Sequence, residues 1–458
     1  MNNTVRFPDG FRWGTATAAY QIEGAVAEDG RTPSIWDTFA HTPGATMHGD
    51  HGDIANDHYH RTESDLDLIA SLGLNLYRTS VSWSRIKPTP DGATNIAGLD
   101  FYERLVDGLL ARGIDPVITL YHWDLPQWWQ DKGGWANRDV VERFADLTEA
   151  VVERLGDRVM QWITVNEPFC VTYIGHLEGR HAPGLRDEAT AVRTVHHVLL
   201  AHGAAMERIR ELAPNAEAGI TLNLSDVHAG TDRPEDVAAA ARVDLVENRM
   251  FLSPVLRGVY PEDAYEFYRG VTDFDFVRPG DLARMSIPAD FLGINFYEQH
   301  HVVAGDSHMG EGKNDRVRGA RKLTPEPPVT AGGVAIRPQA LRNVLNRVHR
   351  DWTELPLWIT ENGLALFDYM TPDGQVHDPE RIAYFDGYLR AAAEAIADGV
   401  PLAGYVAWSL MDNFEWAEGY GWRFGFVYND FGSQQRTPKD SARWLSEVIR
   451  SNSLPDRD

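Results

Sequence analysis

The sequence has few of the features that mark secreted, membrane-bound or nucleic-acid-binding proteins. Cys170 is the only cysteine among 458 residues, so no intramolecular disulfide can form. Residues 1–8 lack the charged head and apolar stretch of a secretory signal, and no apolar run approaches the length of a membrane span. The net charge of −24, with no basic run to offset it, disfavours phosphate backbones and anionic lipid surfaces. We therefore expect a cytoplasmic protein with no nucleic-acid or membrane partner.

Two short acidic motifs stand out against this background. The motif Thr-Val-Asn-Glu-Pro occupies residues 164–168, and Ile-Thr-Glu-Asn-Gly occupies residues 359–363. Each follows a β-rich run and stops at a Pro or Gly turn, which places Glu167 and Glu361 at the ends of strands. A pair of carboxyls mounted in this way suits glycoside hydrolysis, where one protonates the leaving oxygen and the other meets the developing positive charge. The alternative, that each Glu only caps a following helix, is reasonable for one motif but much less so for two.

The hydrophobic pattern predicts a barrel. Segments typical of strands recur at 12–17, 76–80, 116–121, 161–165, 218–222, 291–295, 357–360 and 404–408. Helical periodicity lies between them, for example at 99–112, 140–155, 189–212, 337–350 and 378–398. Alternating strands and helices without a linker or repeat predict a single (β/α)8 TIM barrel, with elaborated loops at its C-terminal face, over residues 1–458. A polar stretch at 305–333 either shapes the entrance to that face or is a solvated excursion.

In such a barrel the two glutamates face each other. Glu167 ends the fourth strand and Glu361 ends the seventh, and strands three apart in a ring of eight lie on opposite sides of the mouth. Polar and aromatic residues also mark other strand ends: Arg78, His122, Trp123, Asp124, Asn223, Asn295, Phe296, Tyr297 and Trp408. Amides and carboxylates can bind sugar hydroxyls, and an indole can cover the C–H face of a sugar. One such residue alone would more often belong to the core, so the argument rests on their repetition.

With these residues in place, the chain closely resembles glycoside hydrolase family 1, the retaining β-glucosidases. The motifs that carry the resemblance lie at residues 11–24, 121–126, 164–168, 359–363, 408–416 and 436–439, in family order. The resemblance implies that Glu167 is the general acid/base and Glu361 the nucleophile, flanked by Tyr297 and Arg78. It also implies a set of residues that hold the sugar: Gln21, His122, Trp123, Asn166, Trp408, Glu415 and Trp416.

The expected activity is that of a retaining, exo-acting β-glycosidase on non-phosphorylated β-glucosides or cello-oligosaccharides, with β-galactosides and β-fucosides as further substrates. No metal or organic cofactor is expected, because His58, His60, His196 and His197 lack a convincing ligand arrangement. The partner is a small-molecule β-glycoside, and the oligomeric state stays open. Alternatives are a 6-phospho-β-glycosidase, a transglycosidase or a catalytically dead sugar-binding barrel. The last would require loss of one glutamate, and both are present.

Overall fold

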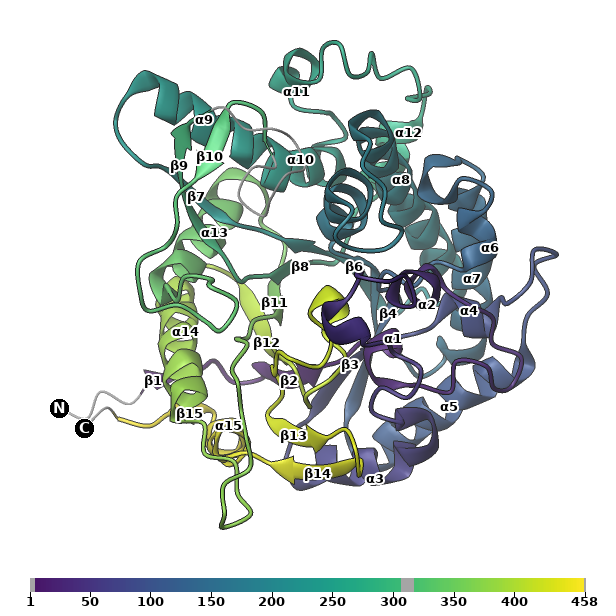
Figure 1. The fold of residues 1–458 in the computed structure, drawn as a ribbon, viewed down its shortest axis with the longest axis vertical. Coiled ribbons are helices and arrows are strands. Elements are labelled where there is room, and N and C mark those ends of the chain that lie inside the picture. The colour runs from purple at the N-terminus through teal and green to yellow at the C-terminus, as the bar shows by residue number, and fades with distance from the viewer. Residues whose placement is uncertain (1–4, 306–316, 457–458) are drawn as a thin grey trace.

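The centre of the molecule is a closed barrel of parallel strands (Figure 1). The computed structural model describes residues 5–305 and 317–456. In sequence order the barrel strands are β2 (Arg12–Ala16), β3 (Leu76–Ser80), β4 (Asp115–Tyr121), β5 (Gln161–Asn166), β6 (Glu217–Asn223), β8 (Phe291–Asn295), β11 (Leu357–Glu361) and β12 (Leu402–Trp408). Each of the eight predicted strands is present, and its ends differ from the prediction by two residues at most. The predicted (β/α)8 fold class is therefore confirmed.

Helices surround the barrel on its outside. The longer ones are α3 (His58–Ser71), α5 (Ile96–Ala111), α7 (Val140–Leu155), α8 (Glu188–Leu212), α9 (Pro234–Asp244), α10 (Met250–Arg257), α13 (Pro338–Asp351), α14 (Pro379–Ala397) and α15 (Asp440–Ser451). Short helices lie in the loops: α1 (Ala19–Ile22), α2 (Ile35–Ala40), α4 (Trp83–Ile86), α6 (Gln127–Gln130), α11 (Glu262–Phe267) and α12 (Asp281–Met285). Single turns of 3-10 helix are η1 (Met47–Gly49), η2 (Gly134–Ala136) and η5 (Trp416–Glu418), and π-helical segments are η3 (Cys170–Glu178) and η4 (Leu245–Arg249).

The core has an inner and an outer layer. Helix α7 shows how the outer layer forms: Val140, Phe144, Leu147, Val151 and Leu155 recur every three or four residues and are all buried. Every residue of β5 is also buried, as expected for a parallel strand covered on both faces.

Inside the barrel, side chains of neighbouring strands leave little room for one another. A Cβ at Gly293 would lie 2.3 Å from Oγ1 of Thr221, which itself donates to Oγ1 of Thr360 at 3.2 Å. Only glycine fits at this point of the inner layer.

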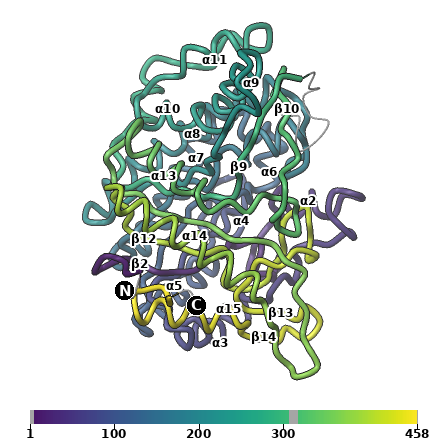
Figure 2. The backbone as a smooth tube through the Cα atoms, turned by 90° about the vertical axis from the view of Figure 1, so that its left-hand side faces the viewer, coloured from purple at the N-terminus to yellow at the C-terminus, as the bar shows by residue number. Residues whose placement is uncertain are grey.

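Small sheets lie outside the barrel. Strands β7 (Asp226–Ala229), β9 (Gln299–Ala304) and β10 (Ala320–Lys322) form a three-stranded sheet beside α9. Strands β13 (Val427–Asp430) and β14 (Gln435–Pro438) form a hairpin, and β1 (Val5–Arg6) pairs with β15 (Ser453–Leu454). The β1–β15 pair holds the two ends of the described chain side by side, as both views show (Figures 1 and 2).

The polar stretch at 305–333 is only partly a loop. Its residues 306–316 lie outside the described chain, whereas Ala320 and Lys322 of β10 are buried. A search of the described helices for one long and apolar enough to cross a membrane finds none.

Candidate active site

Glu167 lies at the C-terminal end of the barrel, immediately after β5. Its backbone has φ +47°, in the left-handed region, and its N–H donates to the carbonyl of Thr221 on β6 at 2.9 Å. Its carboxyl is buried, with Oε1 accepting from Nδ2 of Asn295 at 2.7 Å and Oε2 accepting from the thiol of Cys170 at 3.0 Å. Both partners are neutral, so the carboxyl is held in place by hydrogen bonds and not by a contacting cation.

Glu361 has a different environment at the end of β11. Its Oε1 accepts from Nη1 of Arg78 at 2.7 Å, and its Oε2 accepts from the hydroxyl of Tyr297 at 3.0 Å. Only 1% of the Arg78 side chain is exposed, so water does little to screen this ion pair. Arg78 lies in the middle of β3 and not at its end as the sequence suggested, and its long side chain reaches Glu361 from inside the barrel.

Asn166 links the surroundings of the two carboxyls. Its Oδ1 accepts from Nη2 of Arg78 at 2.6 Å and from Nδ2 of Asn295 at 3.1 Å. Its Nδ2 lies 3.0 Å from Nε2 of His122, which must then accept the hydrogen bond. Burial lowers the pKa of His122 well below its ordinary value, in agreement with a neutral ring.

Burial and mutual repulsion separate the protonation states of the two glutamates. Burial, together with the nearby charge of Glu361, raises the pKa of Glu167 to about 8. Burial also raises the pKa of Glu361, but the charge of Arg78 and the hydrogen bonds from Arg78 and Tyr297 oppose that effect. Near neutral pH the proton of this pair therefore lies on Glu167, and Glu361 is the anion.

A third carboxyl, that of the partly buried Glu415, also lines the cavity. Nε2 of Gln21 lies 3.4 Å from its Oε2 and also donates to the carbonyl of Phe414 at 2.8 Å. Burial, with the charge of Glu361 as the next cause, raises the pKa of Glu415 to about 8. Oε1 of Gln21 is buried without a hydrogen-bond partner. A polar atom left in this state is suited to a ligand hydroxyl.

Aromatic rings line the same cavity and pack against one another. The ring of His122 stacks against Trp408 and Trp416, with centroids 5.8 and 5.9 Å away, and Trp123 lies 4.6 Å from Trp416. Nε1 of Trp123 donates to the carbonyl of Asn166 at 3.0 Å, which fixes that indole.

Three residues of the site have left-handed backbones although none is glycine. The φ angles are +79° at Trp123, +47° at Glu167 and +51° at Trp416. Such conformations cost about 1 to 3 kcal/mol each and persist where the surroundings enforce them, often at functional sites.

These residues surround a cavity of about 220 Å³. Of the catalytic and sugar-binding residues predicted from the sequence, nine line it: His122, Trp123, Glu167, Asn295, Tyr297, Glu361, Trp408, Glu415 and Trp416. Gln21, Arg78 and Asn166 lie directly behind that lining and contact it through the hydrogen bonds above. Asn223 lines the cavity too, whereas Asp124 and Phe296 are buried elsewhere.

Other lining residues were not predicted to belong to the site. They include Cys170, Arg180, His181, Glu418, Trp422 and Phe424. Cys170 stands three residues after Glu167, and this spacing was the one available signal in the sequence; the others come from loops whose path depends on tertiary packing. A second cavity of about 200 Å³ adjoins the first through Arg180, Glu298, Val334 and Trp422, and Leu323, Pro325, Gly332 and Gly333 of the 305–333 stretch line it.

The cavity carboxyls do not form a metal site. Among the described residues, the one group of His, Cys, Asp or Glu side chains with ligand-like spacing is His41, His51 and Asp53, and none of these lines the cavity.

Comparison with known proteins gives matches over the whole chain. Residues 3–454 match the family model described as glycosyl hydrolase family 1. Beta-glucosidase A of Thermotoga maritima is 44% identical over 99% of this chain and 100% of its own length. A bifunctional beta-D-glucosidase/beta-D-fucosidase of Bifidobacterium breve is 46% identical over 98% of this chain and 99% of its own length. The crystal structure of the beta-glucosidase from Thermotoga maritima in complex with castanospermine superposes with a TM-score of 0.93, at 43% identity over 99% of this chain and 100% of that chain.

Proposed function

The chain belongs to glycosyl hydrolase family 1 and is a retaining β-glucosidase, and from this premise we propose that Glu361 is its nucleophile and Glu167 its general acid/base. The observation that carries this assignment is the asymmetry of the pair. Glu361 is ion-paired with Arg78 at 2.7 Å, while Glu167 contacts the neutral Asn295 and Cys170 and has a pKa of about 8. A nucleophile must be ionised and a general acid protonated at the same pH.

The reaction then follows in two displacements. Glu361 attacks the anomeric carbon while Glu167 gives its proton to the departing aglycone oxygen, leaving a glycosyl ester on Glu361. Formation of the ester removes the charge of Glu361, which lowers the pKa of Glu167 and lets it act as a base. Glu167 then takes a proton from the water that hydrolyses the ester, and the β configuration is retained.

We assign the sugar-binding role to the residues around Glu415. Glu415 and Gln21 would bind hydroxyls of the non-reducing sugar, with the buried Oε1 of Gln21 as one acceptor. The indole rings of Trp408 and Trp416 would cover its C–H face. Asn166, His122 and Asn295 would bind hydroxyls nearer the anomeric carbon, where Tyr297 steadies the nucleophile.

The stereochemistry of chemical rescue tests the two glutamate roles. We expect Glu361→Gly to lose activity by roughly several orders of magnitude, as removal of a covalent catalyst usually does. Azide would fill the vacated space and give an α-glycosyl azide. With Glu167→Ala and an activated leaving group the ester still forms on Glu361, and azide must give the β product. A β-azide from Glu361→Gly would overturn the assignment.

Finer points of the function are proposals as well. We propose β-fucosides and β-galactosides as further substrates, and cellobiose and longer cello-oligosaccharides as natural ones, which would place the enzyme in cellulose degradation. The relative of Bifidobacterium breve supports the β-fucoside part. Initial rates on a panel of aryl β-glycosides and cello-oligosaccharides would test all of these substrates. The cytoplasmic location and the organisation of residues 1–458 as one catalytic domain stay predictions, to be tested by cell fractionation and by limited proteolysis.

A further inference from the structure

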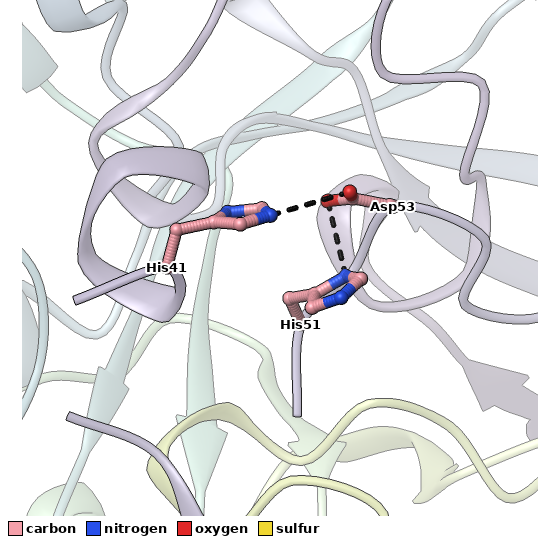
Figure 3. Close-up of side chains that lie close together, drawn as sticks. All are labelled: His41, His51 and Asp53. Atoms are coloured by element: carbon pink, nitrogen blue, oxygen red, sulfur yellow. Dashed lines mark ion pairs between the residues drawn. The ribbon is translucent and has the colours of Figure 1, made fainter. Parts of the chain in front are cut away.

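A cluster of two histidines and one aspartate lies outside the cavity, in the segment that follows α2. Nε2 of His41 is 3.3 Å from Oδ2 of Asp53, and Nδ1 of His51 is 3.2 Å from Oδ1 of the same carboxyl (Figure 3). The side chains of His41, His51 and Asp53 are 50%, 43% and 32% exposed, so the cluster lies at the surface of the protein. The close-up shows both rings directed at the carboxyl.

The spacing of these atoms matches a coordination shell. One ligand atom from each residue lies within 4.8 Å of the other two. Ligands placed about 2.0 to 2.1 Å from a tetrahedral zinc ion are about 3.3 to 3.4 Å from one another. Each histidine nitrogen lies at about this distance from one oxygen of the Asp53 carboxyl, His41 from Oδ2 and His51 from Oδ1, so a small movement of the side chains would bring both nitrogens and one carboxylate oxygen around a single ion. The imidazole rings stack with centroids 4.6 Å apart, which keeps both nitrogens on one side of the carboxyl.

The surroundings of His41 and Asp53 also suit ligands. Nδ1 of His41 donates to the carbonyl of Asp37 at 2.7 Å, so Nε2 is the ring nitrogen that can bind a metal ion once it gives up the proton it shares with Asp53. Metal-binding histidines are commonly oriented by such a bond from the other ring nitrogen. Oδ1 of Asp53 is buried and has no hydrogen-bond partner, so its contact with His51 does not satisfy it. A bound cation would satisfy that oxygen.

We propose that His41, His51 and Asp53 bind a zinc ion through Nε2, Nδ1 and the carboxylate, with water completing the shell. Two imidazoles and one carboxylate favour zinc and its neighbours in the first transition series over magnesium or calcium, which prefer oxygen ligands. The sequence analysis expected no metal, on the basis of His58, His60, His196 and His197. A zinc ion bound by the residues of this cluster would overturn that expectation.

The ion would brace a loop of the active site without entering the chemistry. Tyr420 donates through its N–H to Oδ2 of Asp50 at 2.9 Å and through its hydroxyl to the carbonyl of His51 at 2.8 Å. Tyr420 belongs to the loop that carries Glu415 and Trp416. Holding residues 50–53 in place thus holds this loop, and we expect zinc to raise thermal stability while kcat changes little.

Calorimetric titration of the untagged wild-type protein with zinc chloride tests the proposal. We expect one site whose affinity falls by at least roughly tenfold in His41→Ala and in Asp53→Asn. The matched control is His377→Ala. His377 is an exposed histidine that contacts Asp440 and Asp373 through opposite ring nitrogens, so the two carboxylates cannot share one ion with it. This control should bind zinc as the wild type does. Zinc at roughly 100 times the wild-type Kd should raise the Tm of the wild type by about 3 °C and that of Asp53→Asn by about half as much or less.

A second readout does not depend on the variants. Cobalt substituted into the wild type should show the intense visible absorption of a four-coordinate site, and a zinc-soaked crystal should show an anomalous peak between the three side chains. Failure of the wild type to bind zinc, equal binding by wild type and Asp53→Asn, or loss of binding only in His377→Ala would each overturn the proposal.

Discussion

Glu167 and Glu361 have the same side chain, and their neighbours make them chemically different. A guanidinium and a phenol contact Glu361, whereas an amide and a thiol contact Glu167. The opposing charge of Arg78 keeps the proton off Glu361, and the charge that remains there helps to keep it on Glu167. The roles therefore depend on a few contacts at the residue scale, and changes to single residues should shift them.

Removing the charge of Glu361 should lower the pKa of Glu167. After burial, that charge is the largest cause that raises it. We expect Glu361→Gln to lower the pKa of Glu167 by about 2 to 3 pH units, the size of one unit charge roughly 4 to 6 Å away at an effective dielectric constant near 20. NMR titration of the Glu167 carboxyl in wild type and variant measures the change, and an unchanged value would refute the coupling.

Removing the thiol of Cys170 should act in the opposite direction. Its hydrogen bond to Oε2 of Glu167 favours the ionised form and so lowers the pKa of that carboxyl. In Cys170→Ala the pKa should rise, and the alkaline limb of kcat/KM should move up by about 0.5 pH unit, since one weak hydrogen bond is lost. Cys170→Ser keeps a donor and is the matched control. A limb that moves to lower pH in the alanine variant would contradict this role of the thiol.

At the scale of elements, the barrel was predictable and the loop structures were not. The segments 76–80 and 291–295 have the bounds of β3 and β8. The second is a short apolar run that stops at Asn295, as is usual for a parallel strand buried on both faces. Helix α7 was also predictable, because its apolar residues recur every three or four positions. The sheet of β7, β9 and β10 has no such signal, since β7 pairs with a strand about seventy residues away and only its pairing defines it.

The candidate site shows the same division. Residues on strand ends, such as Glu167, Glu361 and Asn295, follow from the barrel geometry alone. Glu415 and Trp416 lie in the loop after β12 and came only through the resemblance to a family. Cys170 was seen in the sequence but given no role, because its contact with Glu167 depends on the turn of η3 and on the left-handed backbone of Glu167.

The loop after β12 should exclude phosphorylated sugars. Glu415 lines the cavity there, and among the described lining residues Arg180 is the only one with a permanent positive charge. A 6-phosphate at Glu415 would lose its hydration beside a carboxyl, which costs about 4 kcal/mol or more, equal to roughly a thousandfold in rate.

We therefore expect efficient cleavage of p-nitrophenyl β-glucoside and almost none of its 6-phospho analogue, measured as kcat/KM. In Glu415→Ser the ratio of kcat/KM for the glucoside to kcat/KM for its 6-phosphate should fall, mainly because the variant cleaves the neutral substrate less well. A wild type that prefers the 6-phosphate would show that Glu415 does not select the substrate.

At the scale of the whole molecule, the active site reduces the stability of the fold. Glu167 and Glu415 are two carboxyls whose burial raises their pKa to about 8, against an ordinary 4.5. A carboxyl of this kind favours the folded state while it is protonated in both states. As the pH rises from 4.5 toward 8, the unfolded chain loses its proton first and this stability is lost. The proposed roles of Glu167 and Glu415 keep both groups in the site, so the rest of the barrel must offset the cost.

Glu415→Gln should make that cost measurable. The amide keeps the shape of the side chain and cannot ionise, so the variant should lack the pH dependence that Glu415 gives to the wild type. We expect the Tm of the variant minus the Tm of the wild type to be about 1 to 3 °C larger at pH 8 than at pH 5. The change is small because a chain of this length changes its Tm by about 1 °C per kcal/mol. Glu447→Gln, at an exposed position of α15, is the control and should show the same difference at both pH values. Scanning calorimetry of the three proteins at both pH values decides the question. If the Tm of Glu415→Gln differs from that of the wild type equally at pH 5 and pH 8, then Glu415 has an ordinary pKa in the folded protein, and its burial does not reduce the stability of the fold.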